Sequence, residues 1–334
     1  MKKVNTDLLQ VGDIILTTST QKTSALIRKV TNSDISHAMI CVARGSVMDS
    51  TSEGVQARNI QKMFYSDDSA IYVLRAKEAL SPSALAKIVE YARSSTGTSY
   101  SKAEAAAVVT GNGLKMGSAK QFCSRMVARA YDSAGITLVN NVDFCSPEDL
   151  KNSDALIKIE PSWLIVSTEE RDAMSKQEDT TMGMRGVTED LLRRVRVLDK
   201  KIENLNDIDD LLIACAELDI QISESFTLSG YLDYWKIDVS RFPWRYDPLL
   251  MVQLYHSTSE KEDLIKYCRD TLADHEAGAF SHWDKNAKGY AEKNRIYPRR
   301  TFELLSNLYM KLSFNHNERI RSARILLGVY GSNN

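Results

Sequence analysis

The chain has 334 residues, a formal net charge of −1, and 43% hydrophobic and 26% charged residues. These values are typical of a soluble globular protein that is long enough for two domains with separate cores. A near-neutral balance argues against a dedicated nucleic-acid surface, and no apolar run approaches the length that spans a membrane. We therefore expect neither a nucleic-acid partner nor a membrane span.

The N-terminus and the cysteines indicate the compartment. Residues 1–7 contain two lysines with no apolar segment behind them, which is not the pattern of a secretory signal peptide. The five cysteines are odd in number and scattered, as free thiols in a reducing compartment would be. We expect the protein to be cytoplasmic as made, so any export would follow a route independent of a signal peptide. Neither the cysteines nor the five histidines form a metal-ligand motif, so we expect no metal or other cofactor.

The first half of the chain alternates short apolar strands with turns and helices. Gly12 introduces the first strand, and Ser81 followed by Pro82 is typical of a helix start. The expected elements, in chain order, are strands at 11–16, 36–42, 46–51, 55–64 and 70–75, helices at 82–93, 102–109 and 121–134, a helical turn at 146–150, and a strand at 156–166.

The composition changes at residues 167–186, which are polar and poor in large apolar side chains, and we interpret them as a linker. Nearly everything beyond this segment shows helical periodicity. The sequence thus predicts an α+β domain over 1–166, with helices packed on an antiparallel sheet, and an all-α domain over 187–334. The expected helices of the second domain lie at 189–205, 208–222, 248–255, 260–273, 300–314 and 319–330.

Cys123 lies in the first turn of the helix expected at 121–134, which Gly135 is suited to end. The free N–H groups and the positive dipole end of a helix stabilise a thiolate, and the thiolate is the nucleophilic form of cysteine. A buried structural cysteine is the alternative interpretation.

A thiol nucleophile needs a base, and a third polar group must hold that base in position. His37 is the only histidine in the first 255 residues, and it begins a predicted strand. Asp49 follows on the returning strand and is the candidate for the third group, with Glu53 as its competitor.

The turn between these two strands decides whether His37 and Asp49 share a face. A two-residue turn at Arg44 and Gly45 pairs Ile40 with Asp49 and separates the two side chains. A three-residue turn pairs Met39 with Asp49 instead and makes His37 and Asp49 diagonal neighbours. Gly45 supplies the left-handed residue that the longer turn needs at its third position.

Four short segments of the chain resemble, in their order and spacing, segments of the circularly permuted NlpC-type papain-like hydrolases. This group includes the YiiX/YebB-like amidases and the lecithin retinol acyltransferase group. The histidine precedes the cysteine, as in the permuted branch. The resemblance covers roughly residues 7 to 165. The segments that carry it are residues 11–15 (VGDII), 36–40 (SHAMI), 47–50 (VMDS) and 122–127 (FCSRMV).

This resemblance implies that Cys123 is the nucleophile, His37 the base and Asp49 the third residue, although these amidases usually have glutamate at the third position. It also makes the backbone N–H of Cys123 the main oxyanion donor. Residues 97–100 (GTSY) are similar to a glycine-to-tyrosine loop of the family. The secondary candidates are Tyr100, Glu53 and Gln121.

The resemblance implies a cysteine hydrolase that cleaves an amide bond through an acyl-enzyme. We expect a peptide or isopeptide substrate, with peptidoglycan fragments as the leading example, and an effector-like toxin is one interpretation. The helical domain would then recognise a protein partner or the substrate. Acyl transfer or thioester and lipid hydrolysis is a second hypothesis, which a greasy groove beside Cys123 would favour. A non-catalytic papain-like binding scaffold is a third.

Overall fold

The computed structural model describes residues 1–18, 33–99 and 122–331. Tyr100, Gln121 and the helix expected at 102–109 lie outside these residues. The chain divides into two compact units, one of residues 1–185 and 203–206, the other of residues 186–202 and 207–334. Within the described ranges, no helix combines the length and the apolar character needed to cross a membrane.

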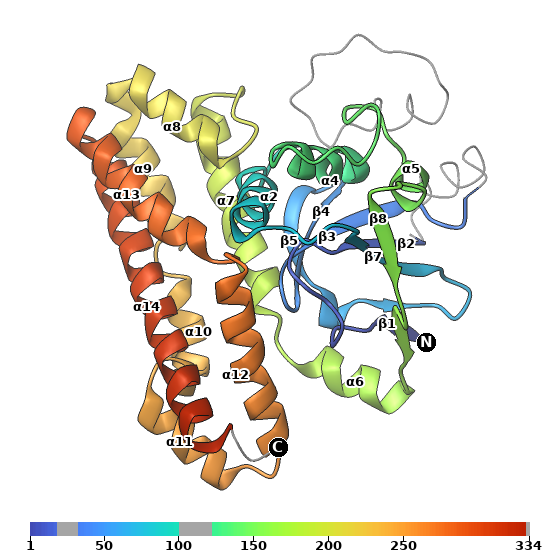
Figure 1. The fold of residues 1–334 in the computed structure, drawn as a ribbon. Helices are drawn as coiled ribbons and strands as arrows, with labels where there is room; N and C mark the ends of the chain where they lie inside the picture. Colours follow the sequence, from blue (N-terminus) through green and yellow to red (C-terminus); the bar gives the residue numbers. More distant parts are fainter. Residues whose placement is uncertain (19–32, 100–121, 332–334) are drawn as a thin grey trace. The chain divides into compact units, whose positions relative to one another are not determined.

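The first unit contains two antiparallel sheets (Figure 1). The larger has the strand order β5-β4-β3-β2-β7-β8, and the smaller has the order β6-β1-β9. This is the predicted antiparallel sheet. The strands are β1 (Lys2–Val4), β2 (Ile14–Thr17), β3 (His37–Ala43), β4 (Ser46–Thr51), β5 (Gly54–Asn59), β6 (Phe64–Tyr65), β7 (Ile71–Ala76), β8 (Leu156–Ile159) and β9 (Trp163–Ile165).

Helices accompany these sheets, and α4 packs against β3 and β4, as the sequence predicts (Figure 1). Ser81 caps α2 by accepting a hydrogen bond from the N–H of Ala84. The segment interpreted as a linker contains α6 and the beginning of α7, and its assignment as a linker stays a prediction. The helices that lie wholly in this unit are α2 (Pro82–Ser94), α4 (Cys123–Asp132), α5 (Pro147–Lys151) and α6 (Thr168–Lys176), and α7 (Thr180–Leu198) begins in it.

Helix α4 is buried along almost its whole length, including residues that are polar. Each of these polar side chains has a specific partner. Ser124 donates to the carbonyl of Cys145 at 2.6 Å, and the Nε of Arg125 donates to the carbonyl of Asp143 at 2.8 Å. The Tyr131 hydroxyl donates to the carbonyl of Gly12, which ties the helix to the turn before β2. Buried polar groups are tolerated when they are paired in this way, so α4 has a fixed position in the core.

The β3–β4 hairpin has the register that unites the candidate residues, with Met39 paired to Asp49. The length of the turn differs from the three residues that this register was expected to need. Ala43 pairs with Ser46, so the turn has two residues, and a bulge between Cys41 and Ala43 supplies the one-residue shift. Gly45 has the positive φ of 78° that was expected of it.

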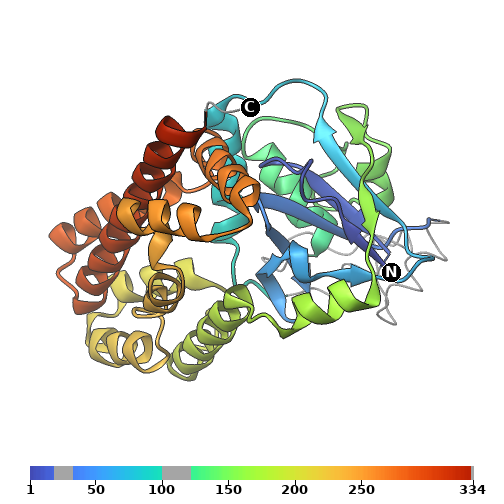
Figure 2. The ribbon, with the colours of Figure 1, turned by 90° about the horizontal axis from the view of Figure 1, so that it is seen from below.

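The second unit is helical, and α14 packs along α11, α12 and α13 (Figure 2). Several expectations were wrong here. Residues 235–241 and 281–296 form helices that were not expected. The helix predicted at 208–222 is divided into two, and the two helices predicted at 300–314 and 319–330 are one. Besides the later part of α7, the helices are α8 (Leu205–Ala214), α9 (Asp219–Leu228), α10 (Trp235–Arg241), α11 (Pro248–Ser257), α12 (Lys261–Glu276), α13 (Ser281–Ile296) and α14 (Arg300–Tyr330).

The beginning of α14 is capped by a residue that is distant in the sequence. The carboxylate of Asp219 accepts hydrogen bonds from the backbone N–H groups of Arg300 and Thr301, at 2.7 and 3.0 Å. A carboxylate at a helix N-terminus satisfies free N–H groups and interacts favourably with the helix dipole. This contact joins α9 to the long helix that organises the second unit.

Gly54 begins β5 directly after the tight turn from β4, and replacing it with alanine should destabilise the first unit. Its φ is +87°, and a Cβ atom there would lie 2.7 Å from the carbonyl oxygen of Thr98. Gly135 is the matched control, because it also has a positive φ but a Cβ atom there would meet nothing within 4 Å. Gly135→Ala should cost about 1–2 kcal/mol of unfolding free energy, and Gly54→Ala clearly more.

Denaturant unfolding measures this difference, and hydrogen exchange of the β4 and β5 amides assigns the loss to the first unit. Equal costs for the two variants would contradict the steric argument.

Candidate active site

Cys123 is the first residue of α4, where its neighbours can stabilise a negative charge. Phe122, which is extended, precedes it at the N-cap position and makes no side-chain cap. The thiol is almost buried, with 6% of the residue exposed. Backbone N–H groups of Ala38 and Ser124 donate to its sulfur. These contacts place the thiol at the junction of α4 with β3.

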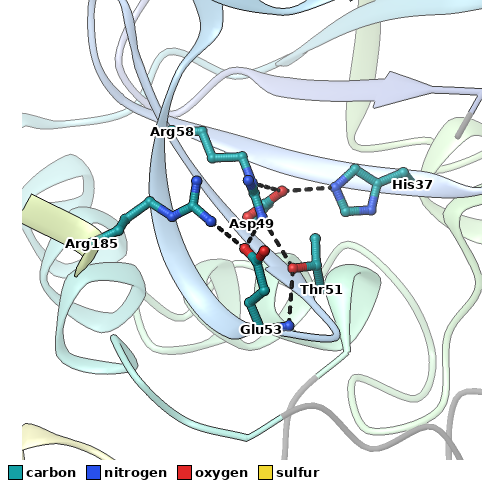
Figure 3. Close-up of polar contacts among 6 residues, drawn as sticks. All are labelled: His37, Asp49, Thr51, Glu53, Arg58 and Arg185. Atoms are coloured by element: carbon teal, nitrogen blue, oxygen red, sulfur yellow. Dashed lines mark hydrogen bonds and ion pairs between the residues drawn. The ribbon is translucent and has the colours of Figure 1, made fainter. Parts of the chain in front are cut away.

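His37 begins β3 and contacts both of the other candidate residues. Its Nε2 lies 3.1 Å from Oδ2 of Asp49 (Figure 3). It also forms a hydrogen bond with Cys123. Since Asp49 occupies the Nε2 side of the ring, Nδ1 is the nitrogen left to face the thiol. The imidazole therefore lies between the thiol and the carboxylate.

The pKa values of this pair shift in the directions that favour a thiolate and an imidazolium. Burial alone lowers the pKa of His37, but hydrogen bonds with Asp49 and Cys123 and the charges of both raise it to about 10. Burial alone raises the pKa of Cys123, but the hydrogen bond and positive charge of His37 bring it below its ordinary value. The two shifts have a shared cause, because each charged form stabilises the other.

Asp49 holds its carboxylate in an almost closed environment, with only 1% of the residue exposed. Its Oδ2 accepts from His37 and also from Nε of Arg58, at 2.6 Å. Within the part of the chain that the structure describes, its Oδ1 has no hydrogen-bond partner. The carboxylate is thus held through one oxygen.

Glu53, the competing candidate, lies away from the imidazole. Its carboxylate accepts from Arg58 at 3.2 Å and forms an ion pair with Arg185 (Figure 3). Its side chain is 55% exposed. The structure therefore brings Asp49, and not Glu53, to His37.

Arg58 was missed in the sequence reasoning. It lies on β5, where Val47 pairs with Arg58 and Asp49 pairs with Gln56. Asp49 and Arg58 are consequently diagonal neighbours across the hairpin. The signal was available: Gln56 and Arg58 alternate with apolar residues just after Gly54, and a tight turn at Gly54 fixes which strand positions face Asp49.

Cys145 and Cys41, the other buried thiols of the first unit, lie in different settings. Burial, together with the nearby charges of Asp149 and Cys123, raises the pKa of Cys145 to about 12. Cys41 lies inside β3 and donates to the carbonyl of Ala43. Burial alone therefore does not activate a thiol here, and the imidazole makes the difference.

The described residues contain no group of three or more His, Cys, Asp or Glu side chains that could hold a metal ion. Asp13, a buried carboxylate of the same unit, is instead paired with Arg75 through two hydrogen bonds of 2.8 Å. It supports the fold and lies apart from the candidate site residues named above.

Comparisons with known proteins identify a family and similar solved structures. The crystal structure of the metalloprotein yiiX from Escherichia coli O157:H7 is 20% identical, with a TM-score of 0.38, and the similarity covers 45% of this chain and 96% of that one. No curated protein matches the chain. Residues 8–185, more than half of the sequence, match the family described as permuted papain-like amidase enzyme, YaeF/YiiX, C92 family. The chain belongs to this family of permuted papain-like amidases.

Proposed function

We propose that the protein is a cysteine amidase in which Cys123 is the nucleophile, His37 the acid and base, and Asp49 the residue that orients the imidazole. The observation that carries the proposal is the position of His37, with the Cys123 thiol on one side and the Asp49 carboxylate 3.1 Å from Nε2 on the other. A thiolate–imidazolium pair of this kind supplies both a nucleophile and a proton.

The reaction follows from these roles. The thiolate attacks the carbonyl carbon of an amide, and a tetrahedral oxyanion forms. The backbone N–H of Cys123, at the start of a helix, lacks an intrahelical partner and is the proposed oxyanion donor. The imidazolium then protonates the leaving amine, which leaves an acyl-thioester on Cys123. Neutral His37 removes a proton from water, and the resulting hydroxide attacks the thioester carbonyl. The carboxylic acid product and the Cys123 thiolate separate, which restores the thiolate–imidazolium pair.

The proposed substrate is a peptide or isopeptide, with peptidoglycan stem peptides as the first class to test. The match to an amidase family supports a peptide-type substrate over a lipid. The helical unit is then proposed to recognise a partner or the substrate, whether the protein acts in the cytoplasm or as a delivered effector.

Mass spectrometry should reveal a substrate when the purified protein is incubated with cell-wall fragments, acyl thioesters and lipids in parallel. The expected result is cleavage of an amide in the cell-wall fragments and its absence with Cys123→Ala. Products only from thioesters or lipids would replace the amidase with an acyltransferase-type enzyme.

Substitutions in the site should rank in a definite order. Cys123→Ala should lower kcat/KM by about 10³-fold or more, because no acyl-enzyme can form, and His37→Ala should be nearly as severe. Asp49→Asn should lower it by only about 10- to 100-fold, since an amide can still orient the ring. Steady-state kinetics on the substrate found in the screen provide the measurement.

Full activity of Cys123→Ala would refute the amidase proposal and leave the binding scaffold. If Asp49→Asn were silent while Glu53→Gln was not, Glu53 would be the orienting residue.

The thiols should differ in their reaction with iodoacetamide. Cys123 should be alkylated at neutral pH, well below the ordinary thiol pKa, because the imidazolium of His37 persists until the pH approaches about 10. Cys145, with its pKa of about 12, should stay unmodified in the folded protein. Amidase activity should fall as the pH rises through about 10, because neutral His37 can no longer protonate the leaving amine.

Peptide mapping against time and pH measures the alkylation, with His37→Ala as the control. Equal rates for Cys123 in the parent protein and in this control would argue against the ion pair.

A further inference from the structure

Arg58 links the buried carboxylate of the site to polar groups at the surface. Its Nε donates to Oδ2 of Asp49 at 2.6 Å, while its Nη2 donates to Thr51 at 3.0 Å and to Glu53 at 3.2 Å (Figure 3). Its side chain is 20% exposed. One guanidinium thus contacts three groups of the β4–β5 hairpin at once, which fixes the direction of its N–H bonds.

The carboxylate of Asp49 depends on this guanidinium. It is nearly fully buried, and in the described residues its only hydrogen-bond donors are His37 and Arg58, both on Oδ2. Of the two contacts, the one to Arg58 is shorter by half an ångström. A buried carboxylate costs free energy unless cations and donors surround it. Among the described residues, the carboxylate without Arg58 would keep the imidazole as its sole hydrogen-bond partner, and its rotation would be less constrained.

We propose that Arg58 is a positioning residue of the amidase, which holds Oδ2 of Asp49 against Nε2 of His37 so that the other ring nitrogen stays directed at Cys123. The proposal rests on the function proposed above. The hydrogen bonds of Arg58 in the described structure are with Asp49, Thr51 and Glu53, so it acts on the imidazole through Asp49. Thr51 and Glu53 hold the far side of the guanidinium, so a lysine, with a single charged atom, would reproduce the role only in part.

Arg185 offers a matched control for Arg58. It is also an arginine, its side chain is 21% exposed, and it also pairs with Glu53, but it contacts neither Asp49 nor His37 in the described structure (Figure 3). Arg58→Met should lower kcat by about 10- to 100-fold with little change in KM, as for other residues that orient a catalytic group. Arg185→Met should stay within about twofold, and Arg58→Lys should recover part of the loss.

A double-mutant cycle separates positioning from a general structural effect. In an Asp49→Ala background, Arg58→Met should change kcat by no more than about twofold, because the residue through which it acts is gone. A further tenfold loss in that background would overturn the proposal. So would equal losses for Arg58→Met and Arg185→Met. Circular dichroism and thermal unfolding show whether each variant folds. If Arg58→Met does not fold, the same comparisons are made with Arg58→Lys.

Alkylation of Cys123 provides a readout that needs no substrate. Arg58→Met should slow the reaction with iodoacetamide at neutral pH about tenfold, while Arg185→Met should leave the rate unchanged. If Cys123→Ala shows that no turnover depends on the thiol, the proposed amidase function fails, but this alkylation arm still decides whether Arg58 positions the site. Equal rates in all three proteins would refute the role of Arg58.

Discussion

A negative charge held inside the protein is the constraint on which the rest of the site depends. The carboxylate of Asp49 is buried beside an imidazole and a guanidinium that come from different strands. Such a group is stable only when its partners are placed within a few tenths of an ångström, because the surrounding protein screens poorly. The two hairpins that supply these partners therefore need a fixed register. The bulge in β3 and the glycine turn between β4 and β5 are the local devices that provide it.

The contrast between Cys123 and Cys145 shows that burial alone does not decide the pKa of a thiol. Both residues are almost inaccessible, and burial raises the pKa of each. One of them meets an imidazole and two backbone N–H groups, and the other meets further negative charge. The pKa values consequently move in opposite directions from the same ordinary value. What distinguishes Cys123 is its place in the first turn of α4, next to His37 at the start of β3.

Much of the site could be read from local sequence, because its parts lie in short segments with strong signals. Gly45 made the pairing of Met39 with Asp49 one of two registers that the sequence allowed, and the helix start predicted the setting of Cys123. The bulge could not be predicted, since a two-residue turn with a bulge and a three-residue turn give the same register. Arg58 required the register of a second hairpin, which depends on the turn at Gly54.

The helices of the second unit were harder to predict, because their apolar periodicity is weak in places. Residues 281–296 are rich in polar and charged side chains, and only Ala287 is buried along α13, so apolar periodicity is weak there. Helix α14 continues through a polar stretch around His316 that looks like a break in the sequence. Glycine and proline are absent from that stretch, and packing along α11, α12 and α13 keeps it helical.

The permuted order of the segments has a consequence for how the site assembles. His37 and Asp49 are separated by 12 positions and belong to one hairpin, which can form early and locally. Cys123 arrives much later in the chain and reaches them only when α4 docks on β3 and β4. Until then the thiol faces water with an ordinary acidity and is a poor nucleophile. Docking of this single helix therefore brings the thiol to the imidazole, so the acidity of Cys123 reports on a long-range step of folding.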